Sequence, residues 1–412
     1  MKYHIDFHIH SKYSRGVSKN MDLEHIEEWC FKKGIEIVGT GDFTYPEWFK
    51  TIKSSLKEVE EGVFRLKNPK VNFLISGEIS CIYSQNGKVH RIHVVVLPSS
   101  LEAAEKINSI LSWVGNLKSD GRPILGLSVI KLCDIIFKKD PEALIIPAHI
   151  WTPWFSLYGS ASGFDSIKEA FGEFSQKIYA LETGLSSDPL MNWQVKEARE
   201  KVLVSSSDAH SPENLGRECT IVETKDPLSF SLFSQLLKEG YQSKIGKIST
   251  LEFYPEEGKY HFDGHRVCKK SFHPEETKKV DGICPYCKKN LTIGVLHRVL
   301  ELADSKEPII PKGASFYYAV PLRELIAEIE GTGVSSKKVK EVYEKIVNQI
   351  PEIDFLLWAS KEEILRIGGE KLAQAVISMR KGEVERIPGF DGQYGVVKVK
   401  TNLKKEEQAS LF

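Results

Sequence analysis

Short apolar runs recur through the first 248 residues, and most of them end next to a histidine or a carboxylate. The strand-like runs are 3–8, 35–40, 71–78, 91–97, 143–148, 178–183, 202–206 and 219–223, and helix-like stretches at 22–33, 101–115, 128–138 and 190–200 lie between them. This alternation predicts an α/β fold with mostly parallel strands. Side chains at the carboxyl ends of such strands converge on one face, so the sequence predicts a shared site there.

The polar residues at these strand ends are of the kinds that bind metal ions. They are His8, His10, Glu78, His93, His149, Asp208 and His210. Imidazole and carboxylate ligands together suit zinc or manganese and can hold several ions close together. Neighbouring cations lower the pKa of a shared water and neutralise charge on a phosphoryl group. We therefore expect these residues to be catalytic and to bind two or three divalent ions of Zn, Mn or Mg.

Three of the motifs resemble those of the PHP (polymerase and histidinol phosphatase) superfamily of phosphoesterases. They are Asp6-Phe7-His8-Ile9-His10, Gly77-Glu78 and Ser207-Asp208-Ala209-His210. The resemblance implies a distorted (β/α)7 PHP barrel. It also implies that His8, His10, Glu78 and Asp208 hold one ion, that Glu78, His93 and His149 hold a second, and that His210 belongs to a third.

The chain departs from this family at the third ion. The family often has Asp-His where this chain has Asp42-Phe43, and its further histidine is absent where Ser14-Arg15-Gly16 stands. Either Asp42 substitutes as a metal ligand or the third ion binds weakly. We expect Arg15 to contact phosphate and Glu182, at a strand end, to support the ligands.

A Cys- and His-rich segment follows, and it predicts a small zinc-binding module over residues 249–300. Cys284 and Cys287 form a Cys-x-x-Cys pair, and His265 and Cys268 have the same spacing. The four together predict one tetrahedral structural zinc, although His261 and His273 compete with His265 for the fourth position. From His265 to Arg298 there are eight Lys/Arg against three Asp/Glu, a local charge of +5 in a chain whose net charge is zero. This basic character favours a polyanionic substrate.

Residues 301–400 are predicted to form a helical DNA-binding domain with helices at 321–330, 336–348, 361–366 and 369–381. The stretch from Leu365 to Ala373 resembles half of a helix-hairpin-helix, whose backbone amides can hold DNA phosphates, and Lys371 is its candidate contact. Residues 401–412 are predicted to be a flexible tail. Its last residues resemble the start of a sliding-clamp (PCNA) binding box, with Gln408, Leu411 and Phe412 as contacts.

The loop 151–164 follows His149 and is rich in aromatic, Gly and Ser residues, so we expect it to overhang the site. Its Trp151, Trp154 and Tyr158 are candidate substrate contacts. A damaged base is cheaper to flip out of the stack than an intact one, and a flipped base needs aromatic walls.

The order of these parts, including Pro388-Gly389-Phe390-Asp391-Gly392, resembles the endonuclease Q family of DNA repair nucleases. The resemblance implies cleavage 5′ to uracil, hypoxanthine, xanthine and abasic sites in double- or single-stranded DNA, leaving a 3′-hydroxyl. A histidinol-phosphatase-like enzyme would need neither the zinc module nor the helical domain. A non-catalytic, clamp-associated DNA-binding protein would not need the full ligand set. A monomer is expected.

The bulk properties of the chain agree with an intracellular protein. No apolar run is long enough to span a bilayer, and the N-terminus enters a strand-like run directly. Cys30, Cys81, Cys133 and Cys219 are scattered among apolar neighbours and read as buried thiols, which fits a reducing compartment. We expect a cytoplasmic protein, associated with the nucleoid and with no membrane partner.

Overall fold

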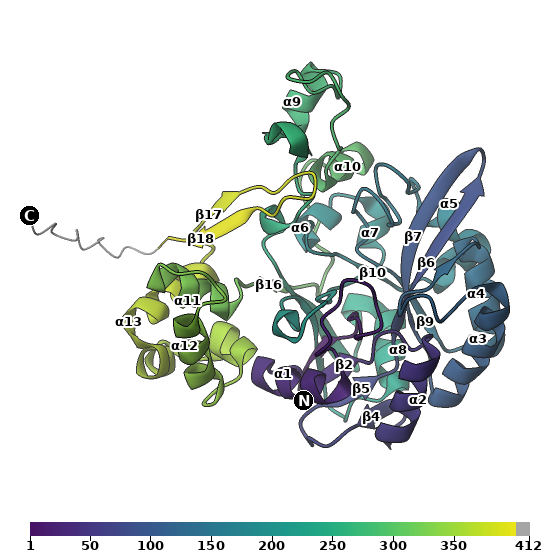
Figure 1. Ribbon diagram of the computed structural model, residues 1–412, viewed down its shortest axis with the longest axis horizontal. Coiled ribbons are helices and arrows are strands. Elements are labelled where there is room, and N and C mark those ends of the chain that lie inside the picture. Colours follow the sequence, from purple (N-terminus) through teal and green to yellow (C-terminus); the bar gives the residue numbers. More distant parts are fainter. Residues whose placement is uncertain (401–412) are drawn as a thin grey trace, which may run out of the picture.

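The computed structural model describes residues 1–400, which form an α/β body, a small module that projects from it and a group of helices beside it (Figure 1). The largest sheet has eight strands in the order β16-β13-β12-β1-β2-β5-β4-β3. Its strands are β1 (Lys2–Asp6), β2 (Ile37–Gly39), β3 (Lys57–Glu60), β4 (Val63–Arg65), β5 (Asn72–Leu74), β12 (Cys219–Thr224), β13 (Gly246–Glu252) and β16 (Phe316–Tyr318). The central strands β1, β2 and β5 are parallel, as predicted.

A second sheet has the order β8-β6-β7-β9, and β10 and β11 form a separate parallel pair. These strands are β6 (Gly77–Gln85), β7 (Lys88–Leu97), β8 (Ile124–Leu125), β9 (Leu144–Pro147), β10 (Ala180–Glu182) and β11 (Val202–Val204). The long β6–β7 hairpin turns at Asn86 and Gly87, whose φ angles are 51° and 77°. An Asn-Gly pair between two β-rich runs predicts a tight hairpin, because it can adopt these positive angles, and the antiparallel pairing of β6 with β7 confirms the prediction.

Backbone hydrogen bonds beyond the strand ends join the sheets to one another. The bonds are His10 N to Ala209 O (3.1 Å), Asp208 N to His8 O (2.9 Å), Thr183 N to Val204 O (3.1 Å), Ile150 N to Glu182 O (3.1 Å) and Ala148 N to His93 O (3.1 Å). They bring the carboxyl ends of β1, β11, β10 and β9 side by side and connect them to β7. The residues after these strands therefore share one region.

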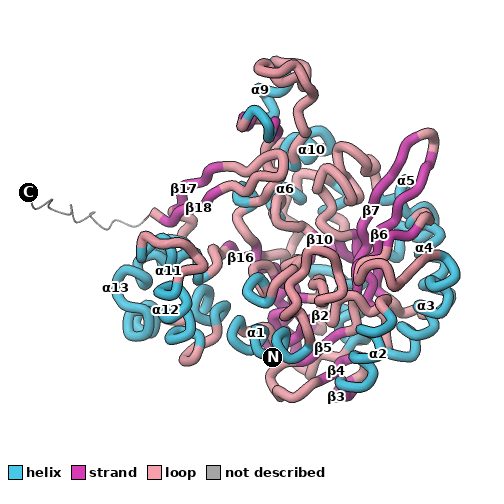
Figure 2. Tube along the Cα trace, in the orientation of Figure 1, coloured by secondary structure: helices cyan, strands magenta, loops and turns pink. Residues whose placement is uncertain are grey.

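Helices lie on the outside of the strands (Figure 2). They are α1 (Leu23–Lys33), α2 (Pro46–Ser55), α3 (Leu101–Val114), α4 (Val129–Lys139), α5 (Ile167–Phe171), α6 (Pro189–Asn192), α7 (Lys196–Arg199) and α8 (Phe230–Glu239). Short turns are η1 (Gly172–Lys177), η2 (Pro212–Asn214), η3 (Gly240–Gln242), η4 (Pro255–Glu257) and η5 (Arg266–Cys268). The helix predicted at 190–200 is broken into α6 and α7. The side-chain amide of Asn192 donates hydrogen bonds to the Ser187 hydroxyl and to Asp188 O, and such local side-chain bonds compete with continuation of a helix.

The C-terminal helices form the predicted helical group. They are α11 (Leu322–Glu330), α12 (Lys337–Val347), the π-helical turn η6 (Asp354–Trp358) and α13 (Lys361–Arg380). Helix α13 bends at Gly369, which has φ 79° and ψ 173°, so the prediction of two helices meeting here is confirmed. A hairpin of β17 (Val384–Ile387) and β18 (Val396–Val399) follows.

This helical group is attached to α1 through a buried ion pair. The Lys33 ammonium lies 2.7 Å from the Glu352 carboxylate, and the two side chains are 2% and 5% exposed. Glu352 also accepts hydrogen bonds from Leu322 N (3.0 Å) and the Tyr343 hydroxyl (2.8 Å). The pair therefore fixes α11 and α12 against the first helix of the α/β body.

We predict that Glu352→Gln lowers the free energy of unfolding by about 3–5 kcal/mol, because it leaves the Lys33 charge buried without its partner. The matched control is Glu344→Gln, which removes a partly exposed partner of Lys32 at the same contact, where Lys32 keeps Glu28 as a second partner. It should cost less than about 1 kcal/mol. Urea unfolding of both variants measures the difference. Equal losses would show that Lys33 is not held by this pair.

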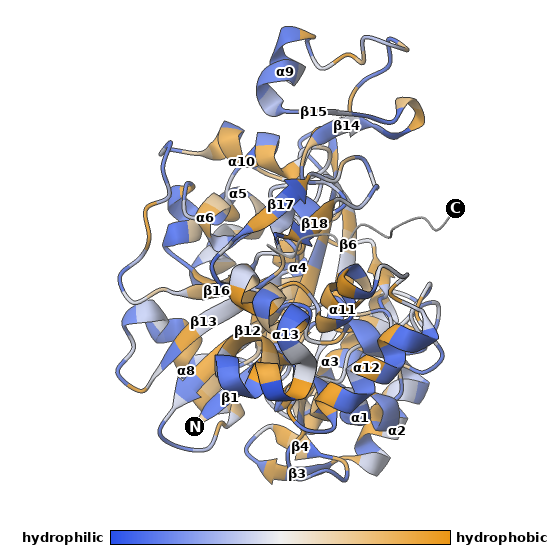
Figure 3. Cartoon of the chain, turned by 90° about the vertical axis from the view of Figure 1, so that its left-hand side faces the viewer, coloured by the Kyte–Doolittle hydropathy of each residue, from blue (hydrophilic) through white to orange (hydrophobic). Residues whose placement is uncertain are grey.

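The projecting module contains β14 (Asp263–His265), β15 (Lys270–Phe272) and α9 (Pro274–Lys279), and α10 (Val295–Leu302) lies at its base. Most of its residues are hydrophilic (Figure 3). The predicted domain boundary at residue 248 falls inside β13, which pairs with both β12 and β16. Strand β16 lies in the segment predicted to be helical. It is a strand instead because Phe316 and Tyr318 pair with β13 and complete the edge of the sheet. Within residues 1–400, no helix combines the length and apolar character needed to cross a bilayer.

Candidate metal centre and substrate cavity

The predicted ligands come from five strands and from the residues that directly follow them. His8 and His10 follow β1, Glu78 lies in β6, His93 lies in β7, His149 follows β9, and Asp208 and His210 follow β11. Their ligand atoms form three groups in which all atoms lie within 4.8 Å of one another: His8, His10 and Glu78; His10, Asp208 and His210; and Glu78, His93 and His149. Glu78 and His10 each belong to two groups, so each is placed to contact two neighbouring ions.

Several of these atoms are buried without a hydrogen-bond partner. They are His8 Nε2, His10 Nε2 and Asp208 Oδ1. His10 Nε2 lies only 3.1 Å from Asp208 Oδ1 and 3.3 Å from Glu78 Oε2, so the atoms point into the same small space. Buried polar atoms are normally paired. A donor set of this kind, left unpaired in the protein alone, fits divalent cations.

Glu182 orients two of the ligands from behind. Both of its carboxylate oxygens lie 3.0 Å from His8 Nδ1, and one of them accepts a 2.7 Å hydrogen bond from His149 N. Because Nδ1 of His8 donates to Glu182, its Nε2 faces the shared space. A carboxylate behind a ligating histidine fixes the tautomer and raises the basicity of the ring. Glu182 therefore contacts both His8 and His149, which is the position that the predicted supporting role requires.

We predict that Glu182→Gln weakens metal binding by about 10- to 100-fold, since an amide offers only one acceptor oxygen for the two donors. Metal retained after dialysis against a buffered series of free Zn or Mn measures the change. Glu197→Gln is the matched control, because Glu197 also accepts two hydrogen bonds but lies away from the ligands, at Tyr158 and Ile167. Unchanged retention in Glu182→Gln would contradict this role.

Asp42 lies behind His10 instead of among the ligand atoms. Its Oδ1 lies 3.1 Å from His10 Nδ1, and its Oδ2 accepts hydrogen bonds from Ser11 N, the Ser11 hydroxyl and the Ser14 hydroxyl at 2.6–2.9 Å. Both oxygens are thus occupied, and the carboxylate is fully buried. The expectation that Asp42 binds an ion is corrected: it orients His10 as Glu182 orients His8.

The backbone at the site adopts conformations that are uncommon for residues with side chains. Asp42 has a φ of 47°, His149 of 30° and Asp208 of 47°. Such angles cost free energy and persist where the surroundings impose them, often at functional sites. Here hydrogen bonds impose them, including the one from His149 N to Glu182 and the one from Asp208 N to His8 O.

The electrostatics keep the carboxylates ionised. Burial alone would raise the pKa of Glu78, but its electrostatic interactions with His93, Arg122 and His8 hold it well below its usual range. Burial opposes ionisation of Asp208 as well, yet the close approach of His10 and the charges of His8 and His10 lower its pKa. Burial lowers the pKa of His93 to about 4, so this ring is neutral and free to ligate near neutral pH.

A cavity of about 840 Å³ opens onto these groups. It is lined by four cationic side chains (Arg91, Arg122, Arg217 and Lys259) and by four aromatic ones (Trp154, Phe155, Tyr260 and Tyr394), together with His93, His149, Asp208 and His210. Arg122 donates a 3.0 Å hydrogen bond to Glu78 Oε2. Sequence reasoning missed all four cations, because each is a single residue in a loop or strand without a recognisable pattern.

Only some of the predicted substrate contacts lie at the cavity. Trp154 lines the cavity. Trp151 and Tyr158 are 1% and 0% exposed; they pack on each other at 4.7 Å and donate to Asn192 and Glu197. These two belong to the core, which corrects their predicted place on the cavity wall. Arg15 is exposed, and only its neighbour Gly16 lines the cavity; Lys371 is exposed on α13.

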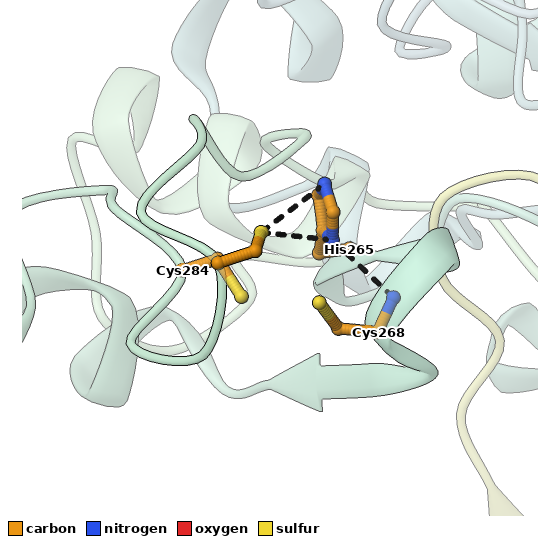
Figure 4. Close-up of side chains that lie close together, drawn as sticks. His265, Cys268 and Cys284 are labelled. Carbon is orange, nitrogen blue, oxygen red and sulfur yellow. Dashed lines mark hydrogen bonds between the residues drawn. The ribbon is translucent and has the colours of Figure 1, made fainter.

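The projecting module brings together the four predicted zinc ligands. One ligand atom each of His265, Cys268, Cys284 and Cys287 lies within 4.8 Å of the others, and Cys287 Sγ is 3.6 Å from His265 Nδ1 (Figure 4). The competing histidines are engaged elsewhere. His261 Nδ1 bonds Ser186 O, and the His273 side chain caps α9. Two thiolates of a Cys-x-x-Cys pair, a third thiolate and an imidazole form a donor set that fits a tetrahedral zinc.

The predicted clamp-binding residues Gln408, Leu411 and Phe412, and the tail 401–412 that holds them, lie outside the described residues.

Known proteins resemble this chain in part and as a whole. The family described as the MJ0043 C-terminal domain matches residues 321–383. The uncharacterized protein MJ0043 of Methanocaldococcus jannaschii is 34% identical over 61% of this chain, which covers only 32% of that relative's length. The uncharacterized protein YqxK of Bacillus subtilis is 28% identical over 96% of this chain and 99% of its own length.

Two solved structures match along the full length. The lesion-specific endonuclease PfuEndoQ of Pyrococcus furiosus superposes with a TM-score of 0.86 at 31% identity and covers 100% of both chains. A complex of endonuclease Q with a 27-mer duplex that carries an abasic lesion at the active site superposes with a TM-score of 0.86 at 30% identity, over 99% of this chain and 100% of that one.

Proposed function

The chain belongs to the endonuclease Q family, and we propose on this basis that it is a metal-dependent endonuclease that cuts DNA beside damaged nucleotides. The observation that carries the proposal is the convergence of three candidate metal-binding groups in one cavity lined by arginines and aromatic rings. A phosphodiester needs cations at the phosphate, and a nucleobase needs flat apolar walls. The cavity offers both.

The seven ligands would hold two or three divalent ions, with Glu78 shared between two of them. The ions, when bound, activate water and neutralise charge on the phosphate. The protein contributes the rest. Glu182 and Asp42 hold His8 and His10 in place, and Arg122 donates to Glu78 while the remainder of its guanidinium faces the cavity. We assign Arg122 and Arg217 to binding of DNA phosphates near the cut.

The finer specificity is proposed from the family resemblance. The enzyme would cleave 5′ to uracil, hypoxanthine, xanthine and abasic sites and leave a 3′-hydroxyl. Weakened pairing or the absence of a base lowers the cost of extruding the nucleotide into a cavity. Trp154 and Phe155 lie at the cavity beside His149 and His93 and could hold the extruded nucleotide.

We further propose that the strands form the distorted (β/α)7 PHP barrel and that the module holds one structural zinc. The hydrogen bonds that join the ends of β1, β11, β10, β9 and β7 support the barrel. The four grouped ligands support the zinc. The helical group would bind DNA at the bend in α13, where an added Cβ on Gly369 would meet nothing within 4 Å and the backbone is open to phosphates. Binding to a sliding clamp and a monomeric state are part of the same proposal.

The proposal is tested with labelled duplexes that carry an abasic site or no lesion. The protein is first stripped of metal with a chelator and then given Mn, Mg or Zn. Nicking of the abasic duplex alone, restored by added metal, is expected. Turnover of a small phosphomonoester without nicking of any duplex would favour the phosphatase alternative, and salt-dependent DNA binding without any cleavage would favour the binding protein.

A further inference from the structure

The loop between β17 and β18 crosses from the helical group to the projecting module (Figure 1). Residues 388–395 of this loop are tied to the segment 256–262 by backbone hydrogen bonds. They are Gly389 N to Glu256 O (2.7 Å), Gly395 N to Glu257 O (3.0 Å), Gly392 N to Lys259 O (3.0 Å) and Phe262 N to Gly389 O (3.0 Å). An exposed loop with this many backbone bonds is held in one conformation.

Two glycines allow the loop to lie this close. A Cβ on Gly389 would lie 2.4 Å from Gly258 O, and a Cβ on Gly395 would lie 2.1 Å from Glu256 O. Neither distance is sterically possible, and both neighbours are backbone atoms that cannot turn away. The close contact therefore depends on glycine at both positions.

One end of the loop is packed under the candidate zinc site. Phe390 lies against Gly264, where a Cβ would come within 2.4 Å of the ring, and Gly264 precedes the ligand His265. Asp391 accepts a 2.6 Å hydrogen bond from Arg266 N and a 2.7 Å hydrogen bond from the Thr292 hydroxyl. The backbone on both sides of His265 thus rests on this loop.

The other end of the loop reaches the substrate cavity. Tyr394 lines the cavity although it lies more than 300 residues from the metal ligands of β1 in sequence. Its side chain is 56% exposed, and the Lys259 ammonium lies 4.6 Å from the centroid of its ring. Trp154 and Tyr260 line the same cavity with ring centroids 6.1 Å apart.

We propose that Tyr394 is a stacking platform for a nucleobase adjacent to the cut phosphodiester, and that loop 388–395 sets its position from the projecting module. The proposal rests on the proposed function and adds to it a specificity-determining residue and the element that places it. An exposed aromatic ring beside a lysine, in a cavity for a polyanion, is the arrangement that binds single bases along a strand. Because the backbone is already fixed, little conformational entropy is lost when a base stacks.

The test measures binding and stacking without cleavage. Duplexes carry an abasic site with 2-aminopurine at the neighbouring positions, and all variants are made in the Asp208→Asn protein, so that the DNA stays uncut and the zinc of the module is not removed. Stacking on Tyr394 quenches 2-aminopurine emission at one position. Tyr394→Ala is expected to lose this quenching and to bind about 5- to 100-fold more weakly, while Tyr394→Phe retains both. Tyr317→Ala is the control, because Tyr317 is a comparable exposed tyrosine that contacts Trp358 and does not line the cavity.

A second variant tests the positioning by the loop. Asp391→Ala removes both side-chain anchors to the module but keeps the Tyr394 side chain. Quenching is expected to fall because the ring is no longer held in position. Wild-type quenching and affinity in Tyr394→Ala, or a Tyr394→Phe variant as weak as Tyr394→Ala, would overturn the stacking assignment. Unchanged quenching in Asp391→Ala would overturn the role of the loop. These readouts need no cleavage, so they test the role of Tyr394 alone. Nicking by the wild-type protein tests the proposed function separately.

Discussion

Asp208→Asn is expected to reduce nicking of lesion-bearing DNA by on the order of 10³-fold, with DNA affinity nearly unchanged. The Asp208 Oδ1 atom is buried without a partner and lies 3.1 Å from His10 Nε2, within the group that also contains His210. Asparagine keeps the shape but removes the negative charge that a cation requires. The arginines that line the cavity remain, so phosphate contacts persist.

Single-turnover nicking and fluorescence anisotropy on the same duplex measure the two effects. Asp134→Asn is the matched control, because Asp134 lies on the exposed face of α4 with its partner Lys138. It should behave as the wild-type protein does. Normal turnover in Asp208→Asn would contradict the ligand assignment, and a parallel loss of DNA binding would show that Asp208 acts in folding of the site instead of in catalysis.

The second large effect is expected for Cys284→Ser, which should remove one zinc per chain and unfold the module locally. The module has few apolar side chains to hold it together, and structural zinc contributes about 10–16 kcal/mol of binding free energy in small sites of this kind. Cys284 is fully buried. A serine hydroxyl is a poor replacement for a thiolate on zinc.

Zinc content per chain and limited proteolysis across residues 263–291 measure this effect. Tyr286→Ala is the control, since Tyr286 lies between the two cysteines of the pair but is 64% exposed and is not a ligand. It should retain zinc and resist protease. If Cys284→Ser kept the same zinc content and the same resistance, the module would be held by packing and not by a metal ion.

Much of the fold follows from periodicity and from turn residues. The pattern predicted β1, β7, β9 and β11 to within a few residues, because each is rich in β-formers and bounded by polar residues. It placed β6 wrongly: the predicted run 71–78 covers β5 and ends where β6 begins. Asn86-Gly87 predicted a hairpin because few other residue pairs adopt its positive angles. The helix-hairpin-helix-like stretch from Leu365 to Ala373 predicted a break between two helices, and it occurs at Gly369. The pairing of β13 with β16 was not predicted, because the two strands are more than 60 residues apart in sequence and no local pattern indicates such a contact.

For the candidate site, too, residues marked by a local pattern could be predicted, and residues whose role depends on long-range packing could not. Histidines and carboxylates at strand ends have a recognisable type and place, so the ligand set could be predicted. Whether a loop aromatic faces a cavity or the core depends on packing, which is why Trp154 and Trp151 were predicted alike but lie differently. Asp42 was taken for a ligand because sequence cannot tell a carboxylate that binds an ion from one that orients a histidine.

The most direct test of the central claim is to map the cut in a duplex with a single uracil, in Mn, with a labelled strand. We expect one break on the 5′ side of the uracil, with a 3′ end that a DNA polymerase extends, and no break in the matched undamaged duplex. Breaks spread along both duplexes, or a product that cannot be extended, would contradict this claim.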